Sequence, residues 1–138
     1  KQYGSKFQIK MSDLKHKMRP EIPSINLDRS SSEVELFQNK VLRPIIKLQH
    51  ELIMCCFSNF IAQNKVLLNE YNEEKKKFYL QKLFKTNTVL KTELRSLIIG
   101  LFTLEEYEHY LSIKPMVIKR INTIIQNRIT SNLVKSEN

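Results

Sequence analysis

The residues of this chain that could do chemistry are three histidines, His16, His50 and His109, and the carboxylates near them. Glu106 and His109 are three residues apart, so on a helix both side chains lie on one face, as metal ligands do in di-iron helical bundles. Such a site needs a second Glu-x-x-His step and two more carboxylates, but Lys47 stands three residues before His50. We therefore predict no metal, no cofactor and an exposed charged face around His109.

Two adjacent cysteines, Cys55 and Cys56, follow His50 at a short distance and are the remaining candidates for a nucleophile. A nucleophilic thiolate must be accessible and activated. Both cysteines lie in the most apolar stretch of the chain, so we expect buried packing residues and predict no catalytic residue. Neighbouring helical residues point about 100° apart, which disfavours a disulfide between them. Cysteines that stay free are typical of a reducing compartment.

Basic side chains are the third chemical feature of the 138-residue chain, whose formal net charge is +9. A charge of this sign is typical of proteins that bind nucleic acids or other polyanions, although it also serves solubility alone. The predicted partner-binding residues are Lys15, Lys17, Arg19, Lys75, Lys76, Lys77, Lys82, Lys85, Lys91 and Arg95. Phosphate contacts need no strict motif, so each cluster taken alone also fits a solvated helix face.

The longest element that must position these residues is a helical pattern from Ser32 to about Asn64. Ser32 and Glu35 form a capping box that starts a helix. Apolar residues then recur every three or four positions, at Val34, Phe37, Val41, Ile45, Leu48, Leu52, Cys55 or Cys56, and Phe60. Pro44 lies inside the pattern and predicts either a kink or two helices, 32–43 and 44–63.

Further helices are predicted at residues 72–85, 88–99 and 103–111, and from Pro115 to about 134. Asn72 is an N-cap for the first of these, and Thr103 with Glu106 forms a second capping box. We expect Gly100 to end the helix before it in a left-handed conformation. With only two glycines and four prolines the chain is predicted to be all-α, as a four- to five-helix bundle with its first helix central.

The sequence predicts that the chain is organised in three segments. Residues 1–30, with seven Lys and Arg against three Asp and Glu, are expected to be a flexible basic arm. Residues 31–134 are the bundle, and residues 135–138 a frayed tail. The N-terminal residues lack the apolar core of a secretory signal, and no run of apolar residues is long enough to span a membrane, so we expect a cytoplasmic protein.

Three stretches of sequence, RPEIP at 19–23, FQNKVLRPIIKLQ at 37–49 and LIIGLFTLEEYEHY at 97–110, are similar to a known family. They resemble short helical bacterial proteins of unknown function that are often catalogued under the label glyoxalase. The resemblance covers most of residues 19–130 and implies a small all-α protein. Glyoxalase I has His and Glu ligands on strands and glyoxalase II has a His-rich motif; this chain has neither, so no residue is carried over as catalytic.

The sequence therefore favours a non-enzymatic, cytoplasmic binding module. Its basic surface is expected to dock on a nucleic acid, a ribonucleoprotein or an acidic protein, and homo-oligomerisation through leftover apolar surface is compatible with that role. The alternative is a glyoxalase-like lyase with a site near His50, Glu106 and His109. Convergence of these three side chains in one pocket distinguishes the two hypotheses.

Overall fold

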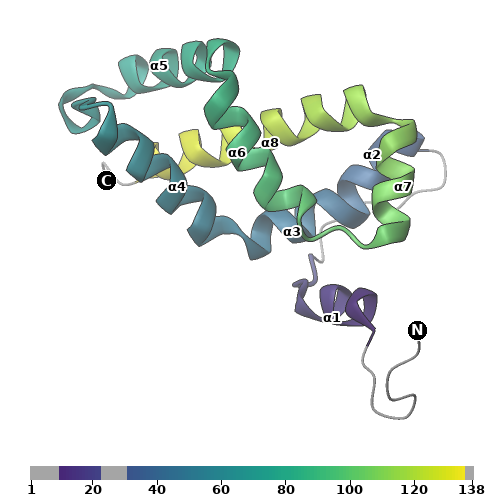
Figure 1. Cartoon of the computed structure of the whole chain (residues 1–138). Coiled ribbons are helices and arrows are strands. Elements are labelled where there is room, and N and C mark those ends of the chain that lie inside the picture. The colour runs from purple at the N-terminus through teal and green to yellow at the C-terminus, as the bar shows by residue number, and fades with distance from the viewer. Residues whose placement is uncertain (1–9, 23–30, 136–138) are drawn as a thin grey trace.

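The computed structural model describes residues 10–22 and 31–135, in which every regular element is helical (Figure 1). In chain order the elements are α1 (Met11–Met18), α2 (Glu33–Phe37), the π-helical segment η1 (Gln38–Leu42), α3 (Arg43–Leu48), α4 (His50–Gln63), the short 3-10 turn η2 (Leu68–Glu70), α5 (Glu73–Thr86), α6 (Thr88–Ile99), α7 (Leu104–Ser112) and α8 (Lys114–Lys135). The all-α prediction is confirmed. None of these helices is both long and apolar enough to cross a membrane.

The helix at the centre of the fold is α8, not the first long helix that we predicted. It contacts α2, η1, α5, α6 and α7. Its inward residues Val117, Ile121, Ile125 and Ile129, four positions apart, are fully or almost fully buried. Figure 1 shows α5 along one side of α8 and α2–α3 along the other, with α6 crossing α8 between them.

The first long helical path runs through Pro44 without a break. Just before this proline the chain is π-helical, and the Arg43 N–H donates to the carbonyl of Gln38, five residues back. Proline lacks an N–H and its ring crowds the carbonyl four residues earlier, so a wider turn at that point accommodates it. The path breaks instead at Gln49, whose φ of −89° and ψ of 9° separate α3 from α4.

This bend at Gln49 changes which residues of the predicted apolar stripe are buried. The residues before the bend, Val34, Phe37, Val41 and Ile45, are in the core as predicted. A ψ near zero turns α4 out of phase with α3, so Ile53 and Phe57 point inward instead. The prediction is wrong for Leu48, Leu52 and Cys55, which are exposed, and Cys56 is only half-buried.

Helices α5 and α6 begin at asparagine caps. The side chain of Asn72 accepts a hydrogen bond from the Lys75 N–H at 2.8 Å, which confirms that cap, and Asn87 accepts one from the Leu90 N–H at 2.9 Å. The predicted buried side of α5 is correct for Leu80, Leu83 and Phe84. It is wrong for Phe78, which is 67% exposed, because α5 turns that position away from α8.

Gly100 ends α6 in a right-handed conformation, with φ −60° and ψ −18°, so the predicted left-handed end is wrong. The chain instead leaves α6 through tight turns, in which the N–H groups of Leu101 and Phe102 donate to carbonyls three residues back. The capping box that starts α7 is confirmed. The Thr103 hydroxyl accepts from the Glu106 N–H at 3.1 Å, and the Glu106 carboxylate accepts from the Thr103 N–H at 2.9 Å.

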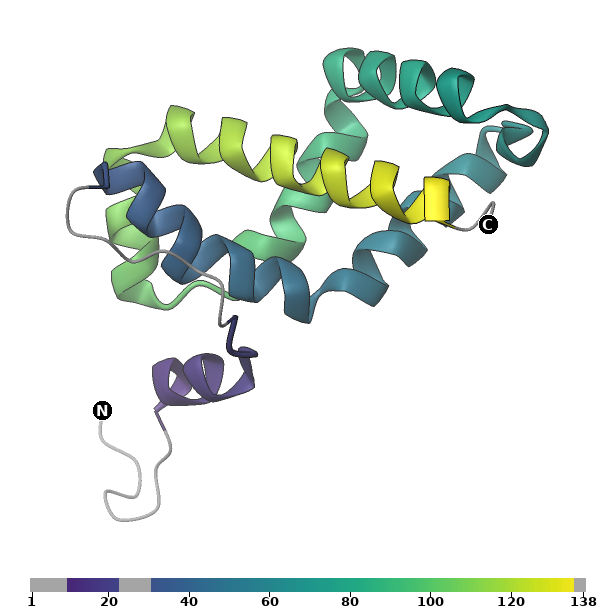
Figure 2. The same cartoon turned by 180° about the vertical axis from the view of Figure 1, so that it is seen from behind.

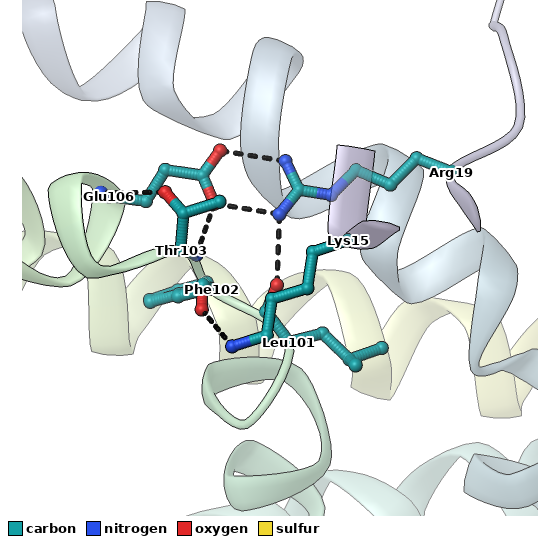
Figure 3. A network of polar contacts seen from close by, with 6 residues as sticks. All are labelled: Lys15, Arg19, Leu101, Phe102, Thr103 and Glu106. Atoms are coloured by element: carbon teal, nitrogen blue, oxygen red, sulfur yellow. Dashed lines mark hydrogen bonds and ion pairs between the residues drawn. The ribbon is translucent and has the colours of Figure 1, made fainter. Parts of the chain in front are cut away.

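Helix α1 lies within the predicted arm and docks on the loop between α6 and α7 (Figure 3). The Lys15 ammonium donates to the carbonyl of Phe102 at 2.7 Å, and the Arg19 guanidinium donates to that of Leu101 at 2.9 Å. Arg19 also donates to both carboxylate oxygens of Glu106, each at 2.7 Å. Cations at the C-terminal end of a helix meet carbonyls that have no partner within it, which explains why α1 docks there.

The rest of the predicted arm, residues 1–9 and 23–30, lies outside the described residues, and so do residues 136–138 of the predicted tail. The first residue of that tail, Lys135, is the last residue of α8. Flexibility of the arm outside α1 stays a prediction.

Candidate anion-binding groove

Helix α8 and the path from α2 to α4 lie side by side and run in the same direction (Figure 2). Two hydrogen bonds tie them together. The Arg120 guanidinium donates to the Gln38 side-chain carbonyl at 2.9 Å, and the Arg128 guanidinium donates to Nδ1 of His50 at 3.1 Å. Arg128 follows Arg120 along α8, and His50 follows Gln38 along the other segment. The two segments therefore run in the same direction.

Two adjoining cavities lie between these segments. The first has a volume of about 430 Å³ and is lined by Val34, Gln38, Arg43, Met116, Lys119, Arg120, Thr123, Ile124 and Asn127. The second has a volume of about 340 Å³ and is lined by Arg43, His50, Ile124, Asn127, Arg128, Ser131 and Asn132. They share Arg43, Ile124 and Asn127 in their linings and therefore adjoin, and we call the two together the α8 groove.

The α8 groove is strongly positive. Arg43, Lys119, Arg120 and Arg128 line it, and none of its lining residues in the described part of the chain is Asp or Glu. Burial, and then the neighbouring charge of Arg43, hold the pKa of Arg128 below its usual range. Two guanidinium groups held close together, without a carboxylate in the lining, favour an anion between them.

His50 also lines this groove and is hydrogen-bonded to Arg128. A guanidinium can only donate hydrogen bonds, so Nδ1 of His50 must be the acceptor from Arg128. In the neutral imidazole the proton is then on Nε2, which can donate to a ligand. Neutral donors and acceptors, the side chains of Thr123, Asn127, Ser131 and Asn132, line the remaining wall. The arrangement can bind phosphate or carboxylate oxygens.

The basic residues predicted on α5 do not line this groove. Lys76 is 4% exposed, so it faces the core and not solvent. Lys77 forms an ion pair with Glu73 at 3.1 Å, and the Lys75 ammonium lies 4.1 Å from the centre of the Tyr71 ring. Lys82 and Lys85 are exposed, and among the described residues neither of them forms a salt bridge or a ring contact. Lys76 therefore lies on the inward face of α5, and a partner site on this helix stays a prediction.

The other predicted partner-binding residues belong to α1 and α6. Lys15 and Arg19 dock α1 on the body of the protein, so their charged groups already have protein partners. Lys17 is exposed on α1, while Lys91 and Arg95 are half-buried on α6. None of these residues lines the α8 groove.

The predicted partner-binding residues include none of the four cations of the groove, Arg43, Lys119, Arg120 and Arg128. The groove brings together segments about 80 residues apart, which no local pattern indicates. One local signal was present: Arg120 and Arg128 are eight residues apart, close to two helical turns, so on a single helix they lie on the same face.

The residues of the lyase alternative do not converge. His50 lines the α8 groove, whereas Glu106 and His109 line a separate cavity of about 630 Å³ beside α1. Nε2 of His109 lies 2.6 Å from the Glu33 carboxylate. No group of three or more His, Cys, Asp or Glu in the described residues could hold a metal ion. The alternative therefore lacks its candidate site in this part of the chain.

Glu106 itself has a structural partner. Burial raises the pKa of its carboxyl, but the hydrogen bonds from Arg19 and from the Thr103 N–H outweigh burial and keep the pKa below its usual value. The carboxylate therefore stays charged and fixes α1. The exposed charged face predicted around His109 is wrong at Glu106, because Arg19 covers this side chain.

A comparison of the chain with family models, curated proteins and solved structures finds no match. The resemblance to helical proteins catalogued as glyoxalases therefore stays a prediction. Any functional argument rests on the groove.

Proposed function

We propose that this protein is a nucleic-acid-binding module that holds the phosphate backbone of a single strand in the α8 groove. One observation supports the proposal above the others. Four cationic side chains, Arg43, Lys119, Arg120 and Arg128, line one groove that has no Asp or Glu among its described lining residues. Lysine, arginine and neutral amide or hydroxyl groups are the side chains that contact phosphates.

The dimensions of the groove favour a single strand over a duplex. From Lys119 to Asn132, α8 rises roughly 20 Å at about 1.5 Å per residue, which is room for about three to six phosphates of one strand. Cavities of about 430 and 340 Å³ can take phosphates and sugars but not the body of a duplex. A ribonucleoprotein would be contacted through exposed single-stranded RNA in the same way.

The arginine content of the groove favours phosphate as the ligand. A guanidinium presents a planar fork that can bind two phosphate oxygens at once, and three of the four cations are arginines. The net charge of +9 adds long-range attraction for a polyanion. In this proposal the helices form one bundle around α8, whose role is to hold the two walls of the groove at a fixed separation.

We place this binding role in the cytoplasm and assign it no catalytic step. Cys55 and Cys56 are free thiols, which is typical of proteins from a reducing compartment. This part of the proposal is tested by localisation of the tagged full-length protein.

Binding is tested by fluorescence anisotropy of a labelled single-stranded oligonucleotide at several salt concentrations. With four phosphate contacts, the logarithm of the association constant should fall with the logarithm of salt concentration at a slope of roughly −3. The double variant Arg43→Gln with Lys119→Gln should bind about tenfold more weakly or worse and lose about 1.4 from that slope. Both residues are exposed, so the fold should be kept.

The matched control is Lys82→Gln with Lys85→Gln, which removes the same charge from α5. Its affinity should change less than about twofold, because only long-range attraction is lost. Equal losses in both double variants would contradict a groove and indicate diffuse attraction. Unchanged binding of the groove variant would also contradict the proposal.

A further inference from the structure

The positive lining of the α8 groove ends at its second cavity. The next cavity along α8 shares Asn132 with it, but is lined mainly by apolar side chains and includes Glu70. The chain bends at Gln49, so α4 leaves the line of α3 (Figure 2), and His50 is the first residue of α4. At this point cationic or donor side chains arrive from three elements: Arg43 from α3, His50 from α4 and Arg128 from α8. In the first cavity the third element is η1, and the side-chain amide of its Gln38 already donates to Asn39 at 3.3 Å.

The described lining at this end contains no carboxylate that could pair with these donors. One Arg128 nitrogen is fixed by Nδ1 of His50 at 3.1 Å, which leaves the rest of the guanidinium fork and His50 Nε2 for a ligand. Arg43 makes a long hydrogen bond, 3.3 Å, from Nε to the side-chain oxygen of Asn39. This bond uses neither of its two terminal nitrogens, which can donate to a ligand. Ser131 and Asn132 close the cavity with neutral polar groups.

We infer that the Arg43–His50–Arg128 end of the groove binds a terminal phosphate monoester of the nucleic-acid strand. A monoester has three terminal oxygens and a charge of about −1.5 to −2 at pH 7, whereas a backbone diester has two such oxygens and one charge. Donors from three helices match the three oxygens of the monoester. The inference rests on the proposed function, because the strand lies in the groove whose positive lining ends at this cavity.

The first cavity does not offer the same chemistry. One terminal nitrogen of Arg120 is already engaged by Gln38 at 2.9 Å, and Lys119 is a single ammonium on a flexible stem. That part of the groove also continues into the second cavity through Arg43 and is not an end. It suits a backbone diester that passes through.

The test uses the full chain and three oligonucleotides of one sequence, with a 5′-phosphate, a 3′-phosphate or two hydroxyl ends. One phosphorylated strand should bind roughly tenfold more tightly than the hydroxyl strand, and which one does so gives the direction of the strand. Inorganic phosphate, added at constant ionic strength, should remove this extra affinity and leave the affinity for the hydroxyl strand.

Two variants locate the effect. Arg128→Gln and His50→Ala should each reduce the preference for the phosphorylated strand to less than about twofold, since each removes a donor to the third oxygen. The control Lys119→Gln should weaken all three strands equally and keep the preference. Each preference is a ratio measured on one protein preparation, so partial loss of folded protein cancels.

Equal affinity for the three strands, with the groove variants still weakening binding, would overturn the inference and leave the proposed function standing. Competition by inorganic phosphate against all three strands equally would also overturn it, because the cavity would then not distinguish an end from a backbone phosphate. Failure to bind any strand would instead contradict the proposed function itself.

Discussion

At the residue scale, two neighbouring cysteines have different environments. Cys55 is exposed and Cys56 is half-buried. Burial, and then the carboxylate of Glu93, raise the pKa of the Cys56 thiol to about 11. A thiol reacts with alkylating reagents as its thiolate, so the reactivity of the two residues should differ.

We predict that limiting iodoacetamide at pH 8 labels Cys55 at least about tenfold faster than Cys56, because only about one in a thousand Cys56 thiols is then ionised. Peptide mass spectrometry measures both rates in the same sample. In Cys55→Ser, labelling of the folded protein should become slow, while labelling in denaturant should be fast. Equal rates in the native protein would contradict the structure of α4.

A second feature at the residue scale is the pair of Arg19 and Glu106, which fixes the position of α1. Their side chains are 7% and 13% exposed, and the two groups form a two-pronged ion pair. The pKa of Glu106 is lowered, so its stabilising contribution is present above the ordinary carboxyl pKa of about 4.3 and is lost as the pH falls through the lowered value. Acid should therefore release α1.

We predict that Arg19→Gln releases α1 at neutral pH. The amide protection of α1 should fall by about tenfold or more, because the guanidinium fork is its main polar anchor, while the other helices keep their protection. Hydrogen exchange measures both. In the unaltered chain, the methyl signals of Met11 and Met18 should shift toward those of the variant below about pH 4.3.

The control for this prediction is Lys17→Gln, which changes an exposed charge on the same helix. Its exchange should match that of the unaltered chain. If Arg19→Gln left α1 fully protected, another contact would hold α1, and the role assigned to Glu106 would be wrong.

At the element scale, α5 has one face in the core and one in solvent. Leu80 is 0% exposed, whereas Phe78, two residues earlier, is 67% exposed. We predict that Leu80→Ala lowers the free energy of unfolding by about 2–5 kcal/mol, because it leaves a cavity against α8. Phe78→Ala should cost less than about 0.5 kcal/mol, since it removes little buried surface. Denaturant unfolding of both variants decides, and a larger loss for Phe78→Ala would refute this orientation of α5.

The elements that the sequence predicted correctly depend on local signals. Asn72 and the Thr103–Glu106 pair each act within a single helical turn, so their caps can be read from the order of residues. The bend at Gln49 could not be read in this way. Its side chain donates to the carbonyl of Leu97 at 2.9 Å, 48 residues away, and such a contact exists only after the chain has folded.

At Pro44 a local sequence rule was also not enough to predict the structure. Its effect on a helix is a local rule, and the rule predicted a kink or a break. The chain accommodates the ring through the π-helical turn of η1, which keeps Leu42, Ile45 and Ile46 fully buried. Packing of these three side chains favours an unbroken path at Pro44 and moves the break to the less buried Gln49.

At the scale of the whole molecule, the two walls of the α8 groove come from opposite ends of the sequence. Arg120 meets Gln38 and Arg128 meets His50 across separations of 82 and 78 residues. The sequence indicated a basic protein, but only the packing of α8 against α2 and η1 brings four cations into one groove. The separate Lys-rich run at the start of α5 was a more visible pattern, yet its middle lysine is buried.

The most direct measurement is photo-crosslinking of the full chain to a single strand that carries 4-thiouridine, followed by mapping of the crosslinked peptides. The proposal predicts crosslinks in peptides from residues 38–50 and 116–132, competed by unlabelled strand and reduced by high salt. Crosslinks confined to α5 and α6, around residues 75–95, would contradict the groove as the binding surface. Absence of any competed crosslink would contradict nucleic-acid binding.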